Sequence, residues 1–204
     1  MFGREVVDEH FDQLVNDIAL LNTLGIRLVL VHGARPQIEH RLKQTHSEIR
    51  YVNGLRVTDD DALAGVKDAV GSLRVEIEAK LSMGLVNAPM AGARIGIASG
   101  NFVMAKPLGI RDGVDYCHTG EVRRIDAPGI HQQLDADRIV LLSPLGYSPT
   151  GEIFNVTAEE IATAAAVALH AEKLVLLVNG GGLRDSNRRL IRQLSLLEAE
   201  QLLR

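Results

Sequence analysis

Apolar residues in this chain follow two alternating patterns. Short runs of β-branched and aliphatic residues predict strands that are covered on both faces of a sheet: 26–31, 138–142 and 173–178. Apolar residues spaced three and four positions apart predict amphipathic helices: 8–24, a segment that starts near Pro36, a long segment that ends near Leu81, and 158–170. This alternation predicts an α/β fold, a three-layer αβα sandwich with a mostly parallel sheet.

The middle of the chain has shorter apolar segments. Those near 94–98, 101–105 and 121–125 predict further strands, which we expect to form an antiparallel patch beside the parallel sheet. The stretch 144–151 predicts a loop, and two more helices are expected: near 129–134 and near 196–203. Because ligands of parallel sheets bind beyond the carboxyl ends of the strands, the turns at those ends are the first candidates for a site.

Two local signals bring an arginine to the start of the long helix. Asn53-Gly54, between two short strand-like runs, is a strong signal for a type I′ hairpin turn. Thr58, with Asp61 three residues later, predicts a helix cap that resembles a capping box. The hairpin would therefore deliver Arg56 to the helix start.

Composition limits the class of protein. With 204 residues the chain is long enough for one sizeable α/β domain, and a hydrophobic content of 46% with only 3% aromatic residues predicts an aliphatic core. The formal net charge of −4 and scattered basic residues argue against nucleic-acid binding. The single cysteine, Cys117, excludes an internal disulfide. No apolar run reaches membrane-spanning length and the first residues are polar, so we expect a cytoplasmic protein without membrane contact.

Gly33-Ala34-Arg35 joins a buried-type strand to a helix. A glycine there lets a ligand approach the backbone, and a helix N-terminus favours an anion. An ordinary strand-to-helix turn explains Gly33 and Ala34 equally well. Arg35 is open to two interpretations, a cation that lines a cleft or a solvated side chain.

Three other residues are candidates for ligand contacts. Arg56, on a short tether between a hairpin and a helix, can grip a carboxylate with two hydrogen bonds, or it can be a solvated edge-strand arginine. Asn155 can contact a ligand amide or carboxylate, and Glu159 can face the same cleft. Thr157 as a helix cap and acidic residues in the first helical turn explain the Asn155–Glu159 stretch without a ligand.

Several common chemical motifs do not occur in the sequence. Neither the G-x-x-x-x-G-K nor the G-x-G-x-x-G nucleotide loop is present, and no His, Cys or Asp cluster has metal-ligand spacing. The Arg/Gln-x-x-Gly-x-Gly/Ala loop that holds coenzyme A in many acetyltransferases has no match either. We therefore expect no catalytic residue, metal or cofactor site in this chain.

Several blocks of sequence nevertheless resemble the amino-acid kinase (carbamate kinase-like) fold and, within it, bacterial N-acetylglutamate synthases. The blocks occur in the order and spacing of that family and cover nearly the whole chain: His32 to Ile38, Val52 to Asp59, Ser99 to Phe102, Asp112 to His118, Arg123 to Asp126 and Phe154 to Ala162.

The resemblance implies a function in arginine biosynthesis. Enzymes of this family transfer the acetyl group of acetyl-coenzyme A to L-glutamate in a separate acetyltransferase domain. Their kinase-like domain binds L-arginine as a feedback inhibitor and builds a homo-oligomer. Residues 1–204 resemble that kinase-like, regulatory domain, so the chain alone is expected to be inactive in acetyl transfer.

The resemblance also implies roles for particular residues. Gly33 matches a glycine that holds the substrate carboxylate in acetylglutamate kinases, whereas Ala34 and Arg35 replace the rest of that turn. Arg56 and Asn155 match residues that contact L-glutamate-derived ligands such as N-acetylglutamate. An alternative function is therefore that of a phosphotransferase acting on N-acetyl-L-glutamate, with Glu159 near the position of an acidic organiser.

Family members extend further at both ends. They begin with a strand and a Gly-Gly turn that residues 1–7 do not match, and their fold continues beyond Arg204. We therefore expect residues 1–204 to form an incomplete amino-acid kinase domain, without its first strand, its C-terminal part and the acetyltransferase domain.

Overall fold

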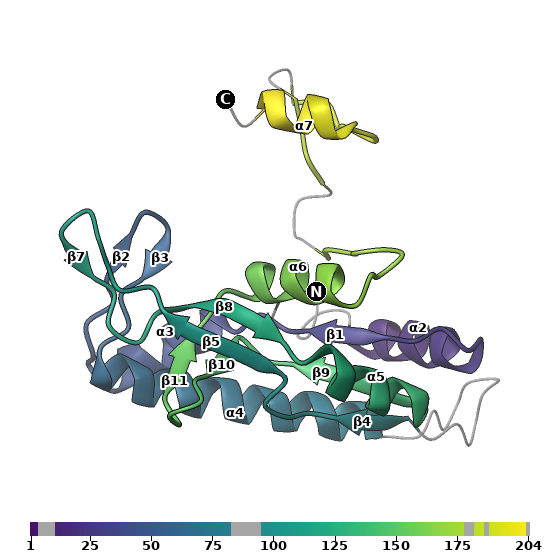
Figure 1. Ribbon diagram of the computed structural model, residues 1–204, viewed down its shortest axis with the longest axis horizontal. Helices are drawn as coiled ribbons and strands as arrows, with labels where there is room; N and C mark the ends of the chain where they lie inside the picture. The colour runs from purple at the N-terminus through teal and green to yellow at the C-terminus, as the bar shows by residue number, and fades with distance from the viewer. Residues whose placement is uncertain (4–10, 83–94, 178–181, 186–187, 203–204) are drawn as a thin grey trace.

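The computed structural model describes residues 1–3, 11–82, 95–177, 182–185 and 188–202. At its centre is a three-stranded parallel sheet in the order β1-β9-β4 (Figure 1). Its strands are β1 (Val29–Val31), β9 (Arg138–Leu142) and β4 (Gly96–Ala98). Three predicted strands thus pair with one another, although Arg94, the first residue of the prediction for β4, lies outside the described residues.

Helices cover both faces of this sheet, because the side chains of β9 alternate between two cores. Ile139 and Leu141 belong to one core and Val140 and Leu142 to the other, and each is at most 1% exposed. The first core is closed by α2 (Phe11–Thr23), α3 (Arg35–Gln44) and α4 (Asp60–Ser82), the second by α5 (Ala127–Asp135) and α6 (Ala158–Ala168). Figure 1 shows α4 and α6 on opposite sides of the sheet, which confirms the predicted three layers.

A second, four-stranded sheet has the order β11-β10-β5-β8. It consists of β5 (Val103–Pro107), β8 (Gly120–Ile125), β10 (Leu145–Tyr147) and β11 (Ile153–Asn155). Only the β10–β5 pair is parallel, so the expected antiparallel patch is present.

The prediction of a loop over 144–151 is wrong, because residues 145–147 form β10. A Cβ atom on Gly146 would lie 2.4 Å from Ala105 Cβ, so the glycine allows β10 to approach β5 closely. This approach depends on β5, which lies about forty positions earlier in the sequence. The prolines and glycines within 144–151 by themselves predict a loop.

The hairpin between β2 (Tyr51–Val52) and β3 (Leu55–Arg56) turns at Asn53-Gly54 as predicted. The φ angles of Asn53 and Gly54 are 49° and 78°, and positive values at both positions are what a type I′ turn requires.

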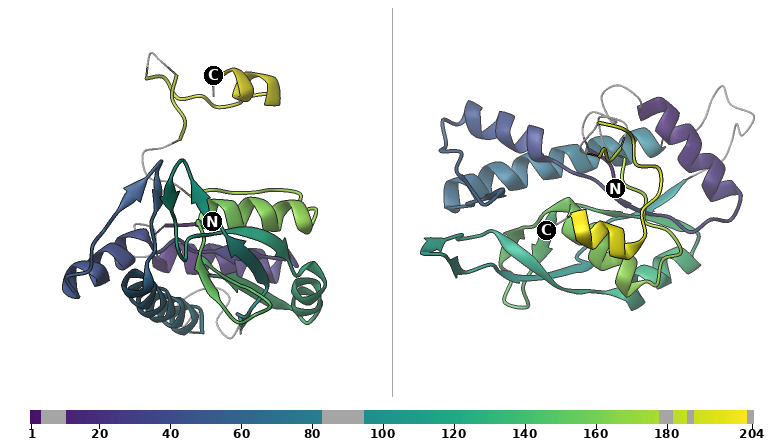
Figure 2. Two further views of the ribbon diagram at one scale, coloured as in Figure 1. Left: turned by 60° about the vertical axis from the view of Figure 1, so that its left-hand side comes forward. Right: turned by 90° about the horizontal axis from the view of Figure 1, so that it is seen from above.

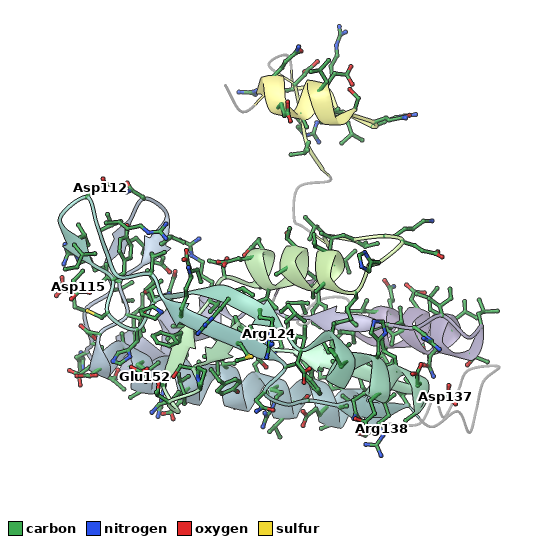
Figure 3. The ribbon with its side chains drawn as sticks, viewed as in Figure 1. Asp112, Asp115, Arg124, Asp137, Arg138 and Glu152 are labelled. Carbon is green, nitrogen blue, oxygen red and sulfur yellow. The ribbon has the colours of Figure 1, made fainter. Side chains whose placement is uncertain are left out.

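The hairpin between β6 (Ile110–Arg111) and β7 (Val114–Asp115) was not expected. Figure 3 labels Asp112 and Asp115 in this hairpin, at the opposite end of the body from Arg138, where β9 begins. The carboxyl ends of the parallel strands therefore face the end of the body that carries the hairpins.

The cap of α4 is Asp59 and not Thr58. The Asp59 carboxylate accepts a hydrogen bond from the Ala62 backbone N–H at 2.8 Å. Thr58 is fully buried and hydrogen-bonded elsewhere, so the predicted Thr58–Asp61 capping box is wrong. Both residue types favour the N-cap, and tertiary contacts of the threonine decide between them.

The prediction of a third buried strand at 173–178 is also wrong, because residues 173–176 form no strand and are exposed. Leu174, Val175, Leu176 and Leu177 are 36–58% exposed, and Val178 lies outside the described residues. Leu177 forms a single parallel bridge to Phe2, which also bridges His32 beside β1. An apolar run becomes a buried strand only when other elements cover its faces, and local sequence does not report that cover.

The last described helix, α7 (Leu196–Leu202), stands apart from the layered body (Figures 1 and 2). Within the described residues, no helix has the length and apolar character needed to span a bilayer.

Two glycines of α4 provide a test of the packing between α3 and α4. A Cβ atom at Gly71 would have no neighbour within 4 Å, whereas one at Gly65 would lie 2.6 Å from Cδ2 of the fully buried Leu42. We expect Gly71→Ala to raise the free energy of unfolding by about 0.5–1 kcal/mol, because alanine is the better helix former. Gly65→Ala should lower it by about 1 kcal/mol or more through overpacking. Urea unfolding of both variants measures these changes, and equal stabilisation by both would contradict the packing described here.

Candidate functional site

Polar residues follow directly after each strand of the parallel sheet. His32 follows β1 and is fully buried, and its Nε2 lies 2.9 Å from the Ser143 hydroxyl after β9. Ser99, after β4, donates a hydrogen bond of 2.7 Å to Glu78 of α4. The first contact joins the ends of β1 and β9, and the second joins the end of β4 to α4.

His32 is held as a neutral ring. Its burial, opposed by the hydrogen bond to the Gly33 carbonyl and assisted by the charge of Arg74, lowers its pKa to about 4. A neutral imidazole satisfies both neighbours by donating from Nδ1 to Gly33 and accepting from Ser143 at Nε2. His32 therefore has a structural role at this edge.

The turn at Gly33 uses its own backbone donor internally. The Gly33 N–H donates to the Phe2 carbonyl at 2.8 Å. Ala34 is the N-cap of α3 and is buried, and its methyl side chain makes no capping hydrogen bond. The Gly33 N–H group therefore already has a hydrogen-bond acceptor. Arg35, the first residue of α3, is exposed.

Arg56 is buried and belongs to a cluster with Tyr51, Glu39 and Arg35. Its side chain is 5% exposed, and Nη2 donates to the Tyr51 hydroxyl and lies 3.7 Å from Glu39 Oε1. The Tyr51 hydroxyl donates to Glu39 at 2.8 Å and accepts from Arg35 Nε at 3.1 Å. Both guanidinium carbons lie close to the Tyr51 ring centroid, that of Arg35 at 4.4 Å and that of Arg56 at 4.7 Å.

The pKa values of three residues in this cluster are shifted from their ordinary values. Burial lowers the pKa of Arg56, which measures the cost of keeping its charge out of water, and burial raises the pKa of Tyr51. The hydrogen bond to Tyr51 raises the pKa of Arg35. Within the part of the chain that the structure describes, Arg56 Nη1 is buried and has no hydrogen-bond partner. A buried N–H group of this kind is suited to an anionic oxygen.

Asn155 is connected to the Arg56 segment through two buried threonines. Its side-chain N–H donates to the Thr58 hydroxyl at 3.1 Å, and the hydroxyls of Thr58 and Thr119 are 3.0 Å apart. Thr119 also donates to the Arg56 carbonyl. This chain of hydrogen bonds fixes β3 against the end of β11.

Glu159 and its neighbour Glu160 differ in role. Glu159 is exposed in the first turn of α6, whereas Glu160 accepts a hydrogen bond of 2.6 Å from the Val122 backbone N–H in β8. Thr157 caps α6 by accepting from the Glu160 backbone N–H, as the sequence suggested. The contacts here account for Glu160 and leave Glu159 facing solvent.

The structure thus unites some of the sequence candidates. Arg35 and Arg56 meet at Tyr51, and Asn155 joins the Arg56 segment, whereas the contacts of Gly33 lead to Phe2 and His32 instead. Sequence reasoning missed Tyr51, Glu39, Thr58 and Thr119 as parts of the site. The pairing of Tyr51 with Arg56 follows from the hairpin register, so the hairpin signal could have indicated that residue.

Two surface hollows are lined by residues other than Arg35, Arg56 and Asn155. One, of about 430 Å³, lies between α3 and α4, and the other, of about 300 Å³, lies beside the β6–β7 hairpin and includes Cys117. Burial, together with neighbouring carboxylates, raises the pKa of Cys117. In the described ranges, no three His, Cys, Asp or Glu side chains gather as metal ligands would.

Comparison with known proteins identifies relatives of the whole chain. Residues 1–204 match the model of the amino acid kinase family. Proteins named amino-acid acetyltransferase from Pseudomonas syringae pv. syringae and Azotobacter vinelandii are each 55% identical over 192 residues, which is 94% of this chain and 44% of the relative. The chain thus spans less than half the length of these curated relatives.

Solved structures are also similar to this chain. N-acetylglutamate synthase from Neisseria gonorrhoeae, complexed with coenzyme A and N-acetyl-glutamate, is similar with a TM-score of 0.87 and 36% identity, over 98% of this chain and 46% of that one. The same protein complexed with coenzyme A and L-arginine gives the same TM-score and identity over 47% of its length. The structure of smu.665 from Streptococcus mutans UA159 matches with a TM-score of 0.72 and 31% identity, over 84% of this chain and 68% of that one.

The buried His32 predicts a pH dependence of stability. Its pKa is about 4 in the folded chain against 6.5 when exposed, so only the unfolded state gains this proton between these values. The free energy of unfolding should therefore fall as the pH drops from about 6.5 to 4, by about 3 kcal/mol from this group, and should not respond to it above about pH 7.

Urea unfolding at several pH values measures this effect. His32→Gln should be flatter than the parent chain in that window. Ser143→Ala is the control, because it removes a hydrogen bond but keeps the ring buried, so it should lose about 1 kcal/mol and retain the pH slope. Identical slopes for the parent and His32→Gln would show that His32 is not held neutral.

Proposed function

The chain belongs to the amino acid kinase family, and we propose that it forms the kinase-like, regulatory and oligomer-forming domain of an N-acetylglutamate synthase. The observation that carries the proposal is the similarity of nearly the whole chain to two complexes of one such enzyme, at 36% identity and a TM-score of 0.87. The acetyl transfer from acetyl-coenzyme A to L-glutamate is then the task of another domain.

The Arg56 region is the proposed ligand site of this domain. Arg56 supplies a buried cation with an N–H group that has no hydrogen-bond partner in the described part of the chain, and the Asn155 side chain is hydrogen-bonded to Thr58 of the same segment. Such a pair suits a small amino-acid ligand that carries a carboxylate and an amide, as N-acetyl-L-glutamate does. Arg35 adds a second positive charge at the start of α3.

Regulation by L-arginine is the second part of the proposal. One of the two N-acetylglutamate synthase structures that this chain resembles is complexed with L-arginine. The acetyltransferase domain and further copies of the chain are the proposed protein partners, through which ligand binding would affect catalysis.

Three assays on the chain of residues 1–204 test the function. We expect calorimetry to detect binding of L-arginine or N-acetyl-L-glutamate. We also expect no release of coenzyme A from acetyl-coenzyme A and L-glutamate, because this chain supplies ligand binding and the transfer chemistry lies elsewhere. Release of coenzyme A above background would contradict this division of labour.

A third assay addresses the phosphotransferase alternative. Arg56 and Asn155 match residues of acetylglutamate kinases, so the chain is incubated with ATP, magnesium and N-acetyl-L-glutamate. We expect no ADP, and ADP formation that depends on N-acetyl-L-glutamate would favour a kinase over a regulatory domain.

A further inference from the structure

We infer that the Asn53–Gly54 peptide, at the turn of the β2–β3 hairpin, is a site of spontaneous covalent modification. Asn53 loses its side-chain amide there and is converted in part to isoaspartate, which alters the hairpin that carries Arg56. The inference concerns the chain itself and goes beyond the proposed function, because it involves no ligand.

The turn leaves both residues open to solvent. Asn53 and Gly54 are exposed, and a Cβ atom placed on Gly54 would have no neighbour within 4 Å. Among the residues that the structure describes, the Asn53 side chain makes no hydrogen bond, and the Gly54 N–H donates to no backbone carbonyl. Solvent base can therefore reach the backbone nitrogen, and no contact holds the side-chain amide away from it.

The reaction needs only these two residues, solvent base and water. The base takes the proton of the Gly54 N–H, and the nitrogen attacks Cγ of Asn53. The Cγ–Nδ2 bond breaks and ammonia leaves with the proton that the base returns, which closes a five-membered succinimide ring. Water then opens the ring: attack at the main-chain carbonyl gives isoaspartate, and attack at Cγ gives aspartate. No oxidant or reductant takes part.

The residue that follows each asparagine decides which asparagine reacts. A side chain on that residue crowds the attacking nitrogen, and glycine has none. In this sequence Asn53 and Asn179 are the asparagines that precede glycine, and Asn179 lies outside the described residues. Asn101 and Asn155 precede phenylalanine and valine, so they serve as slow references within the same chain.

Ring closure requires the turn to leave its type I′ conformation briefly. The hairpin has two residue pairs, and the pair next to the turn, Val52 with Leu55, is only partly buried. Two-stranded hairpins are marginally stable by themselves. Opening this one pair gives Asn53 the rotation that the attack needs, while the buried Arg56 stays in place.

Isoaspartate changes the length of the turn. Its main chain passes through Cβ and Cγ, so the loop gains one backbone atom, whereas the register of this hairpin is set by a two-residue type I′ turn. Arg56 cannot follow a shift in register, because its side chain is 5% exposed and its carbonyl accepts a hydrogen bond from Thr119. Isoaspartate therefore destabilises the hairpin. Aspartate keeps the normal backbone and tolerates a positive φ angle.

Peptide mapping of the chain after incubation at mildly alkaline pH tests the inference. Trypsin cleaves after Arg50 and Arg56 and releases residues 51–56, in which Asn53 is the sole side-chain amide. We expect this peptide to gain one mass unit at least about tenfold faster than the peptides that contain Asn101 and Asn155, because the barrier is lower before glycine. Part of the product should accept a methyl group from an isoaspartyl methyltransferase, and the melting temperature of the chain should fall as it accumulates.

Two variants separate the loss of the amide from the change in the backbone. Asn53→Gly keeps a sequence that a type I′ turn accepts and removes the reacting amide, so residues 51–56 should keep their mass and the melting temperature should not fall during incubation. Asn53→Asp carries the other product on a normal backbone, so before incubation it should melt at the temperature of the unmodified chain.

The results decide the inference without any ligand, so the proposed function is judged separately by its own assays. An unchanged mass of residues 51–56 would overturn the inference, because the turn would then protect Asn53. A gain in mass without isoaspartate, or without a fall in the melting temperature, would contradict the lengthened turn. A lowered melting temperature of fresh Asn53→Asp would contradict it too, since the loss would then come from the added charge.

Discussion

The two-sided burial of β9 is the constraint on which the rest of this structure depends. Its side chains alternate between the two cores, so the strand must lie between helical layers and must pair on both edges, with β1 and β4. The parallel direction of these pairs brings His32, Ser143 and Ser99 to one edge of the sheet. The chemistry of the chain is accordingly expected at that end of the body, which also carries the hairpins.

At that end, the fold keeps a cation out of water. The β2–β3 hairpin determines where Arg56 lies, and the hydrogen bonds of Thr119 to the Arg56 carbonyl and of Asn155 to Thr58 fasten this segment to the second sheet. Tyr51 and Glu39 then share the charge with Arg35. Among the described residues, Arg56 is thus a fixed positive group whose Nη1 is buried without a hydrogen-bond partner.

Much of the fold and part of the candidate site could be predicted from the sequence. Particular residues show which features could not be predicted. The Asn53-Gly54 turn was correct because two positive φ angles are a local requirement that few residue pairs satisfy. Thr58 was mistaken for a helix cap because its burial against Thr119 arises from contacts about sixty positions away in the chain. Tyr51 was missed for a related reason, since its partners Glu39 and Arg35 come from another element.

The sequence by itself determined the alternation of helices and strands, the hairpin and the family, because periodicity, turn chemistry and ordered motifs are properties of neighbouring residues. Tertiary structure alone decided that Leu145–Tyr147 forms a strand and that residues 174–177 remain exposed. It also decided which nitrogen of Arg56 has no hydrogen-bond partner within the residues that the structure describes. Burial, strand partners and unsatisfied donors depend on groups that are far apart in the chain, so local patterns do not contain them.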